Sequence, residues 1–455
     1  MNLFELKNIL IKELCQFSKN DKKQIDNAKI RETADFLSFE YDLHSLSLQS
    51  LCHYTAAIPI CYLKSKESER EDLAIGLCRK FSSKSDLKNL NTQIENENLV
   101  FFGGQKFDPK QRAALEWQAF GDQYYFLPRI WFSHQASTNS KLTVFIDKAE
   151  IKNGKINEHL ILEIENLLDF RNAELTDTSE VSIDSFLYDH QVPGLHKWEE
   201  NIGKCLKRLK QDLEKVVLSR KQVYKATFND VMSVFLQPHK QKNNHYVFLL
   251  KLDEDHLFVS LTPEKLFKVE NSVLTSDAIA GTRPRGETER KDQKFQTELQ
   301  NSNKELREHR VVSYQISKSF EQTCTSYEKL SKEKVLKLNN VQHLISEFKG
   351  RLKEKQNYLE MINLFHPTPA VGGHPKKEAL ELIKQLEGYD RGFYSAPVGI
   401  LSKNYTEFIV AIRSALLHKS DLHVYGGAGI VTGSEAHEEW SETQKKMNTI
   451  REYIL

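Results

Sequence analysis

The spacing of apolar residues changes along the chain, and each change marks a predicted element. Leu3, Leu6, Leu10 and Leu14 recur at helical intervals, which predicts an amphipathic helix at the amino end. Similar spacing predicts helices over 196–214, 287–324, 376–387 and 434–446, and residues 114–132 run from helix to strand, with Pro128 near the joint. Short apolar runs predict strands at 100–109, 141–147, 245–252, 256–270, 273–282, 392–402, 406–418 and 421–433, and another beginning at Lys215.

The order of these elements indicates a fold class. Strands come in runs with helices interspersed, rather than in strict alternation, and this favours an α+β protein with large, mainly antiparallel sheets. A length of 455 residues allows one or two domains, and hydrophobic residues at 39% supply enough material for a core. Residues 1–95 contain few candidate functional residues, and we interpret them as a peripheral, divergent part of the fold. The main region then spans 96–455.

The charge balance narrows the classes of partner. Basic and acidic residues number 64 and 63, so the formal net charge is +1. Such a chain has no global field to attract nucleic acid or an anionic membrane, and we expect neither as a partner. Any anionic ligand must therefore be met by a local site.

Cysteine usage and the amino end indicate the compartment. The six cysteines show no CxxC spacing, and the first residues mix Glu and Lys through their apolar positions instead of forming a signal peptide. Apolar runs are far shorter than the roughly 18 residues that a membrane helix needs. We expect a reduced, cytoplasmic protein that does not span a membrane.

Two glutamate pairs are candidate metal ligands. Glu439 and Glu442 stand three positions apart in "SEAHEEWSETQKK", and Glu305 and Glu308 have the same spacing in "KELREHRVV". Residues three apart share a helix face, and two such pairs could hold one hard cation, for which Mg²⁺ fits an all-oxygen set. Solvated surface is the commoner reading of such pairs and stays open. Zinc is disfavoured, because the chain has no HExxH motif and no suitably spaced cysteines.

Four further segments hold polar residues at turns or strand ends. In "AIAGTRPRGE", Gly281 and Thr282 could bind an anion through backbone N–H groups, although a plain basic loop explains them equally well. Thr368 lies in the Pro- and Gly-rich "HPTPAVGGHP", where a structural turn is the default. Lys215 begins a strand and Glu264 follows a proline at a strand end, and both would be unremarkable at a surface.

Taken in order, these segments resemble the chorismate-utilising enzymes, a family of anthranilate, aminodeoxychorismate, isochorismate and salicylate synthases. The resemblance spans 215–446, about half the chain, with a weaker match from "FFGGQKFDP" through Trp117 to "FLPR". It rests on "KVVLSR", "LTPEKLF", "AIAGTRPRG", "REH", "VQHLIS", "HPTPAVGGHP", "RGFYSAPVG", "AIRSA" and "GAGIVTGSEAHEEWSETQKK". It implies two large packed antiparallel sheets flanked by helices, as in anthranilate synthase component I, and makes 96–455 the chorismate-binding region.

The resemblance also implies a Mg²⁺-dependent site. Glu308 and Glu439 would be the main metal ligands, with Glu305 and Glu442 beside them, and the metal would hold one carboxylate of chorismate. The other, enolpyruvyl carboxylate would be bound by Arg413, whose guanidinium can donate two parallel hydrogen bonds. The remaining matches to pocket positions are Tyr394, Gly427, Gly429, Gly281, Thr282, His343, Thr368 and Lys446.

Two positions bear on the nucleophile. Ala280 stands where aminodeoxychorismate synthases carry a nucleophilic lysine, and Lys215 stands where family members that add water, but generally not those that add ammonia, have a lysine. The resemblance thus points to isochorismate synthase, an isomerase, with a salicylate synthase that also expels pyruvate as the alternative. A regulatory paralogue without turnover is a third hypothesis, which the intact Lys215 and Glu264 argue against.

The implied chemistry assigns roles to the two residues. Water attacks C2 of the ring while the C4 hydroxyl departs, so one group must take a proton and another must give one. By resemblance, Lys215 would be the base in its neutral form and Glu264 the acid in its protonated form. We expect no glutamine amidotransferase subunit and a monomer or weak homodimer, and leave open whether the product feeds menaquinone or a siderophore.

Overall fold

The computed structural model describes residues 3–17, 27–44, 46–54, 58–95, 99–135, 140–169, 183–228, 232, 234, 245–331, 333–337, 341–354 and 356–454. Its helices are α1 Leu3–Gln16, α2 Leu48–Tyr54, α3 Lys84–Glu95, α4 Glu158–Leu167, α5 Leu195–Arg208, α7 Glu289–Asn301, α8 Asn303–Thr323, α9 Tyr358–Phe365, α10 Lys376–Leu386 and α11 Ala436–Ile454. In this part of the chain, none of the helices is both long and apolar enough to cross a membrane.

The strands begin with β1 Lys29–Glu32, β2 Phe36–Leu43, β3 Ile60–Lys64, β4 Glu71–Phe81, β5 Phe101–Gln105, β6 Gln123–His134, β7 Ser140–Asp147, β8 Ile151–Lys152, β9 Lys155–Ile156, β10 Ile183–Val192, β11 Lys215–Phe228 and β12 Tyr246–Asp253. They continue with β13 His256–Thr262, β14 Lys265–Glu270, β15 Val273–Pro284, β16 Cys324–Lys329, β17 Lys334–Lys337, β18 Val341–Leu352, β19 Gly373–His374, β20 Pro397–Leu401, β21 Tyr405–Val410, β22 Ser414–His418 and β23 Asp421–Ile430.

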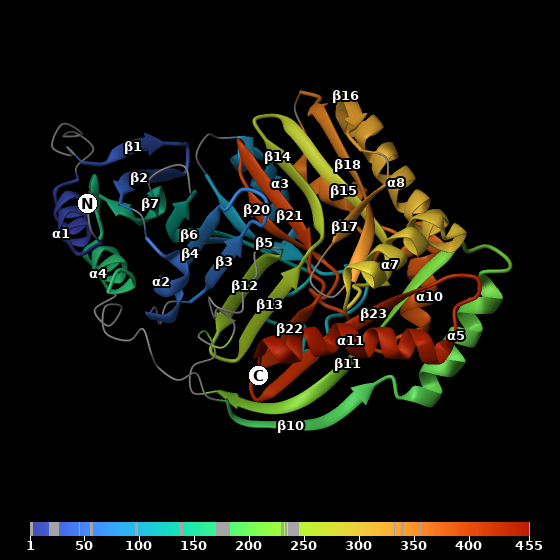
Figure 1. The fold of residues 1–455 in the computed structure, drawn as a ribbon. Coiled ribbons are helices and arrows are strands. Elements are labelled where there is room, and N and C mark those ends of the chain that lie inside the picture. The colour runs from blue at the N-terminus through green and yellow to red at the C-terminus, as the bar shows by residue number, and fades with distance from the viewer. Residues whose placement is uncertain are drawn as a thin grey trace.

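The described strands form two large antiparallel sheets that share strand β6, which confirms the predicted fold class (Figure 1). One sheet runs β10-β11-β23-β22-β13-β12-β3-β4-β6-β7-β2-β1. The other runs β6-β5-β20-β21-β14-β15-β18, and β18 also pairs with β16 and β17. Hydrogen bonding therefore joins 21 strands into one network.

Strand β6 changes partners along one of its edges. Its first residues pair with β5, up to Phe102 opposite Phe126, and its later residues pair with β7, from Ile130 opposite Val144. Pro128 lies between these two segments, where that edge has no partner. Because proline has no N–H to donate, it is tolerated at this change of partner.

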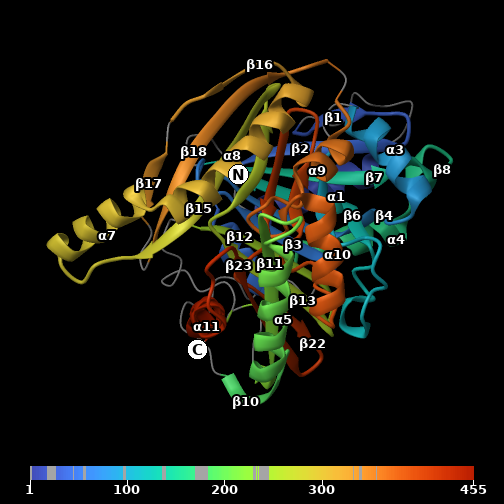
Figure 2. The ribbon, with the colours of Figure 1, turned by 90° about the vertical axis from the view of Figure 1, so that its right-hand side faces the viewer.

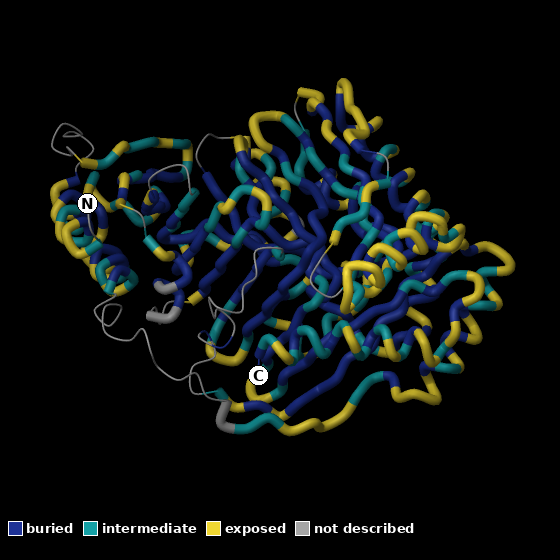
Figure 3. Tube along the Cα trace, viewed as in Figure 1, coloured by how far each residue is buried: buried dark blue, intermediate teal, exposed yellow. Residues whose placement is uncertain are grey.

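The apolar side chains are divided between two cores. Strand side chains alternate between faces, so in β12 Phe248 and Leu250 enter the core between the two sheets, whereas Val247 and Leu249 face the core beneath α1 and α4. The helices cover the outer faces: α8 lies along β15 and β18, α11 lies across β23, and α5 and α10 stand in front of the strands in Figure 2. Figure 3 shows the central strands buried and the outer helix faces exposed.

Two predicted elements are divided by single residues. The predicted helix 287–324 is two helices, because Ser302 has a non-helical backbone and its hydroxyl caps α8 by accepting from the Glu305 N–H. The predicted strand 406–418 is β21 and β22, separated at Arg413, whose φ is 48°. Both breaks place a candidate site residue at an element end.

Three other predictions need correction. The helix expected after residue 114 is a single 3₁₀ turn, Leu115–Trp117. The strand expected at 392–402 begins only at Pro397, and 256–270 is two strands joined by a turn at Pro263 and Glu264. The amino-terminal helix and the terminal helix are confirmed, with α11 extending to Ile454. The boundary at residue 95 stays a prediction, although β3 and β4 from before it belong to the first sheet.

Candidate active site

A cavity between the two sheets gathers most of the predicted site residues. It is lined by Lys215, Glu264, Gly281, Thr282, His343, Tyr394, Arg413, Gly427, Gly429, Lys446, Glu308 and Glu442. These come from eight or more separate elements and turns, so only the tertiary fold brings them together. Thr368, Glu305 and Glu439 are not among the lining residues. The wall also includes Ala280, the position compared above with a nucleophilic lysine. It further includes residues that sequence reasoning did not assign: Val217, Pro263, Ile279, Ala370, Val371, Ser395, Ile412, Tyr425 and Gly426.

Lys215 points into this cavity from the start of β11. Its side chain is only 3% exposed, and its ammonium donates to Glu308 Oε1 at 2.5 Å. The surface alternative is therefore wrong for Lys215. Gly429 on the neighbouring strand β23 makes room for the lysine, because a Cβ added there would stand 2.9 Å from Lys215 Cε and 3.3 Å from Nζ.

Glu264 occupies the turn between β13 and β14 and is 8% exposed, so it is not a surface carboxylate. Its N–H donates to Thr262 Oγ1, its carbonyl accepts from the Val410 N–H, and its Oε1 accepts from Thr368 Oγ1 at 3.3 Å. Burial raises the pKa of Glu264 from 4.5 to about 7, and the Thr368 hydroxyl opposes this rise. Thr368 thus supports Glu264 from behind.

Gly281 and Thr282 form a bulge at the end of β15. Gly281 has φ +75°, and a Cβ there would lie 3.2 Å from Glu305 Cβ and Oε2. The Glu305 carboxylate accepts from the Thr282 N–H at 3.1 Å and from Arg283 at 2.5 Å. Across the strand pair, His343 Nδ1 lies 3.0 Å from Thr282 Oγ1, and burial lowers the pKa of His343 to about 4. Glu305 therefore fixes this bulge, and His343 is neutral at pH 7.

Arg413 and Tyr394 also line the cavity. Burial lowers the pKa of Arg413 to about 10, so its guanidinium is still charged at neutral pH. Its Nη1 donates to His245 Nε2 at 2.8 Å, and the Tyr394 ring stacks on Tyr425 with centroids 5.0 Å apart. A partly buried guanidinium suits a carboxylate, to which it can donate two hydrogen bonds. His245 was missed because nothing in the sequence relates it to Arg413.

The last helix closes the cavity with a basic and an acidic side chain. Lys446 Nζ donates to the Gly427 carbonyl at 2.9 Å and pairs with Glu442 at 2.7 Å. Lys446 lowers the pKa of Glu442. One turn earlier, Glu439 is 6% exposed. Burial raises the pKa of Glu439, and the nearby Glu442 carboxylate raises it further. Glu439 is thus a buried carboxylate beside a second one, not solvated surface.

This donor set fits a hard divalent cation. The carboxylates of Glu308 and Glu442 line the cavity, and the crowding of Glu439 by Glu442 is relieved by positive charge. Within the described residues, however, no three acidic, histidine or cysteine side chains already converge on one point. Lys215 contacts Oε1 of Glu308 and Lys446 contacts Oε1 of Glu442, so a cation would share these two carboxylates with the lysines.

A buried ion pair supports the cavity wall from behind. Arg391 pairs with Glu387 at 2.5 Å and donates to the carbonyls of Val217 and Val371, two wall residues. Glu387 in turn accepts from the Ser219 N–H at 2.7 Å. The sequence signal existed, since Arg391 begins the signature "RGFYSAPVG", but its role needed the structure.

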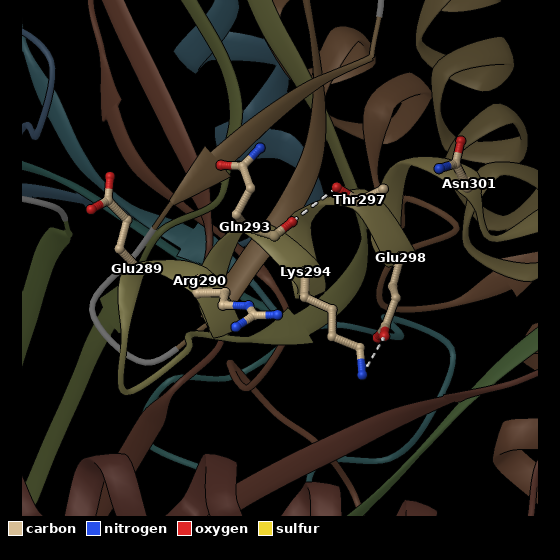
Figure 4. Close-up of a pocket in the computed structure, with 7 residues that line it drawn as sticks. All are labelled: Glu289, Arg290, Gln293, Lys294, Thr297, Glu298 and Asn301. Carbon is tan, nitrogen blue, oxygen red and sulfur yellow. Dashed lines mark hydrogen bonds and ion pairs between the residues drawn. The ribbon is translucent and has the colours of Figure 1, made fainter.

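A second hollow lies on the exposed face of α7 (Figure 4). All of its lining residues belong to this one helix, and Lys294 and Glu298 form an ion pair there. Because it joins no groups from other elements, it has none of the converging chemistry of the first cavity.

Comparison with known proteins identifies the class. Residues 48–455 match the model of the chorismate binding enzyme family. The chain is 31% identical over 352 residues to a chloroplastic isochorismate synthase of Catharanthus roseus, covering 76% of this chain and 60% of that relative. It is 31% identical over 353 residues to isochorismate synthase MenF of Bacillus subtilis, covering 76% and 73%. The chain thus spans less than two thirds of the plant relative's length.

The fold has a solved counterpart. The structure of MenF, the menaquinone-specific isochorismate synthase from Escherichia coli, superposes with a TM-score of 0.82 at 21% identity, covering 100% of both chains. At this identity the superposition speaks for the fold. The match of residues 48–455 to the family model shows that the chain belongs to the chorismate binding enzyme family.

Proposed function

We propose that this protein is an isochorismate synthase that converts chorismate to isochorismate. The observation that carries the proposal is that a buried lysine and a buried glutamic acid, Lys215 and Glu264, line one cavity. The relatives named isochorismate synthase support the same assignment. The reaction is an isomerisation, because one water is added and one is lost.

Chorismate carries two carboxylates, and the cavity offers each a different environment. The enolpyruvyl carboxylate pairs with Arg413, which is partly buried and charged, next to the Tyr394 hydroxyl and the backbone from Gly427 to Gly429. The ring carboxylate faces the opposite, glutamate-lined side. Thr282 and His343 bound the space between them. The Arg413 contact, together with a cation at the glutamate-lined side, would orient the ring with respect to the acid and the base.

The proton transfers then follow. Once Lys215 has released its own proton, its amine takes a proton from water as the water oxygen bonds to C2, both ring double bonds shift by one position, and the C4–O bond breaks. Glu264 gives its proton to the departing hydroxyl, which leaves as water. A pKa of about 7 keeps a large fraction of Glu264 protonated near neutral pH, as an acid requires. At the end of the reaction Lys215 has gained a proton and Glu264 has lost one. Proton exchange with solvent returns both residues to their starting states.

We also propose that Mg²⁺ is the cofactor. Glu308 and Glu439 would hold it, with Glu305 and Glu442 beside them, directly or through water. When bound, Mg²⁺ neutralises the ring carboxylate and fixes its position. Because Glu305 already accepts hydrogen bonds from the Thr282 N–H and from Arg283, we propose that it acts through that backbone or a water rather than by a direct bond.

The test is product analysis with purified protein, chorismate and Mg²⁺. We expect isochorismate alone. Salicylate with pyruvate assigns the alternative, a salicylate synthase, and unchanged chorismate assigns a paralogue without turnover. Added ammonium should give no amino product, because we propose water as the nucleophile and no amidotransferase partner. The matched pair Lys215→Ala and Lys225→Ala separates the site from the strand, since Lys225 lies on β11 but pairs with Asp421 at its exposed end.

A further inference from the structure

The turn that carries Glu264 has an anchor from the amino-terminal part of the chain. Within the turn and its neighbours, Thr262 accepts from the Glu264 N–H and Val410 donates to the Glu264 carbonyl. The preceding carbonyl, that of Pro263, accepts from Lys66 Nζ at 2.8 Å. Lys66 lies in the connection between β3 and β4, in the segment that the sequence marked as peripheral.

Strand register explains how Lys66 reaches this turn. In the order β3-β12-β13, Lys64 stands opposite Val247, and Tyr246 stands opposite Thr262. The chain just beyond Lys64 therefore passes the end of β12 and meets the chain just beyond Thr262. The half-buried Lys66 ammonium lies 5.3 Å from the centroid of the Tyr246 ring, a favourable place for a cation.

The neighbouring charges leave the Lys66 ammonium directed at the turn. Lys265 is the residue that pairs with Glu67 at 2.7 Å and with Asp277 at 3.2 Å. Burial lowers the pKa of Lys66, and Asp277, Glu67 and Glu264 act against this, while Lys265 adds to it. The Lys66 ammonium is partly buried and donates to the carbonyl that precedes Glu264. It therefore fixes the position of this turn and places a positive charge near the Glu264 carboxyl.

We infer that Lys66 is a positioning residue for Glu264, holding the Pro263–Glu264 turn through the Pro263 carbonyl and placing a positive charge beside the acid. The inference rests on the proposed function for its kinetic consequence, but not for its electrostatic one. It links the amino-terminal part of the chain to the position and charge state of the proposed acid.

The electrostatic consequence follows from the groups that face Glu264. Burial raises its pKa, and the opposing groups are the Thr368 hydroxyl and then the cations Lys215, Lys446 and Lys66. Arg413 faces the same carboxyl. Lys215 and Lys446 are each paired with a carboxylate of their own, Glu308 and Glu442. Removing the Lys66 charge therefore moves the pKa of Glu264 upward.

The first experiment titrates Glu264 directly and needs no turnover. In full-length protein with ¹³C-labelled glutamate carboxyls, Glu264→Gln identifies the resonance, and its titration is followed in wild type, Lys66→Met and Lys66→Arg. We expect a higher pKa in Lys66→Met and the wild-type value in Lys66→Arg. Lys268→Met is the matched control, because Lys268 also lies over a tyrosine ring, at 5.2 Å, but pairs with Glu270. An unchanged Glu264 titration in Lys66→Met, or an equal change in Lys268→Met, overturns the inference.

The second experiment measures kcat against pH for isochorismate formation. Lys66→Met removes the hydrogen bond to the Pro263 carbonyl. This should lower the plateau kcat by about tenfold, because a displaced Glu264 donates its proton more slowly. The decline of kcat at high pH should also begin at a higher pH than in wild type. Lys66→Arg should recover both, and Lys268→Met should resemble wild type. If wild type forms no isochorismate, the proposed function fails, whereas the carboxyl titration still decides the role of Lys66.

Discussion

Ionisation of Glu264 should lower the free energy of unfolding of the protein. The variant Glu264→Gln tests this prediction. The carboxyl is 8% exposed, and its pKa is raised from 4.5 to about 7 by burial. Glutamine keeps the shape and cannot ionise. In wild type, raising the pH above 4.5 ionises Glu264 in the unfolded chain first, so the folded state loses stability progressively until the pH passes about 7.

The magnitude follows from the two pKa values. Their difference of about 2.5 corresponds to about 3 kcal/mol at 1.36 kcal/mol for each pKa unit. Below pH 4.5 both side chains are neutral, so the variant and wild type should have similar free energies of unfolding. The advantage of Glu264→Gln should then grow with pH and level off above about pH 7, near 3 kcal/mol.

The assay is equilibrium urea unfolding of both proteins at a series of pH values from 4 to 8.5. Glu289→Gln, on the exposed start of α7, is the matched substitution at a surface glutamate. Glu264→Gln should also lose isochorismate formation while it keeps chorismate binding. A stability difference that does not change with pH would refute the reasoning, because it would mean that Glu264 is ionised in the fold as readily as in the unfolded chain.

Three further results are expected. Lys215→Ala should abolish hydration of chorismate and leave binding, measured by calorimetry, largely intact; near-normal turnover would remove Lys215 as the base. Gly429→Ala should lower kcat at least tenfold but cost less than about 1 kcal/mol of stability, since its Cβ meets the flexible ends of the Lys215 and Glu308 side chains. Gly399→Ala, whose Cβ would stand 1.9 Å from the Glu407 carbonyl oxygen, should prevent folding. Arg413→Lys should raise KM about tenfold with a smaller change in kcat, because lysine cannot donate two parallel hydrogen bonds; an unchanged KM would remove Arg413 as the carboxylate ligand.

Part of the local structure was predictable. Apolar spacing located the first helix, β5 to β7 and most elements from α5 onward, because period 2 and period 3.6 are properties of a short stretch. It predicted none of β1 to β4, α2 to α4 or β16 to β18. It could not locate Ser302, where the helix divides, or Arg413, where the strand turns through φ 48°, because apolar spacing continues across both. These breaks are set by capping and by backbone conformation at one residue.

The candidate site divides in the same way. Residue types in ordered motifs were enough for the family and for the cavity residues, including Lys215, Glu264 and Arg413. They did not reveal that Thr368 supports Glu264 and that Glu305 braces the Gly281 bulge. These contacts join residues that are far apart in sequence, and they cannot be inferred from a single sequence without its fold.

The sequence by itself therefore determined the α+β class, the order of elements and the chemical types that the cavity could contain. The tertiary structure decided which of them meet, how deeply they are buried and which charges face them. Burial decides most, since a carboxyl such as Glu264 becomes an acid near neutral pH only when water is removed from around it. Removal of water depends on packing between both sheets, and no single stretch of the chain fixes that.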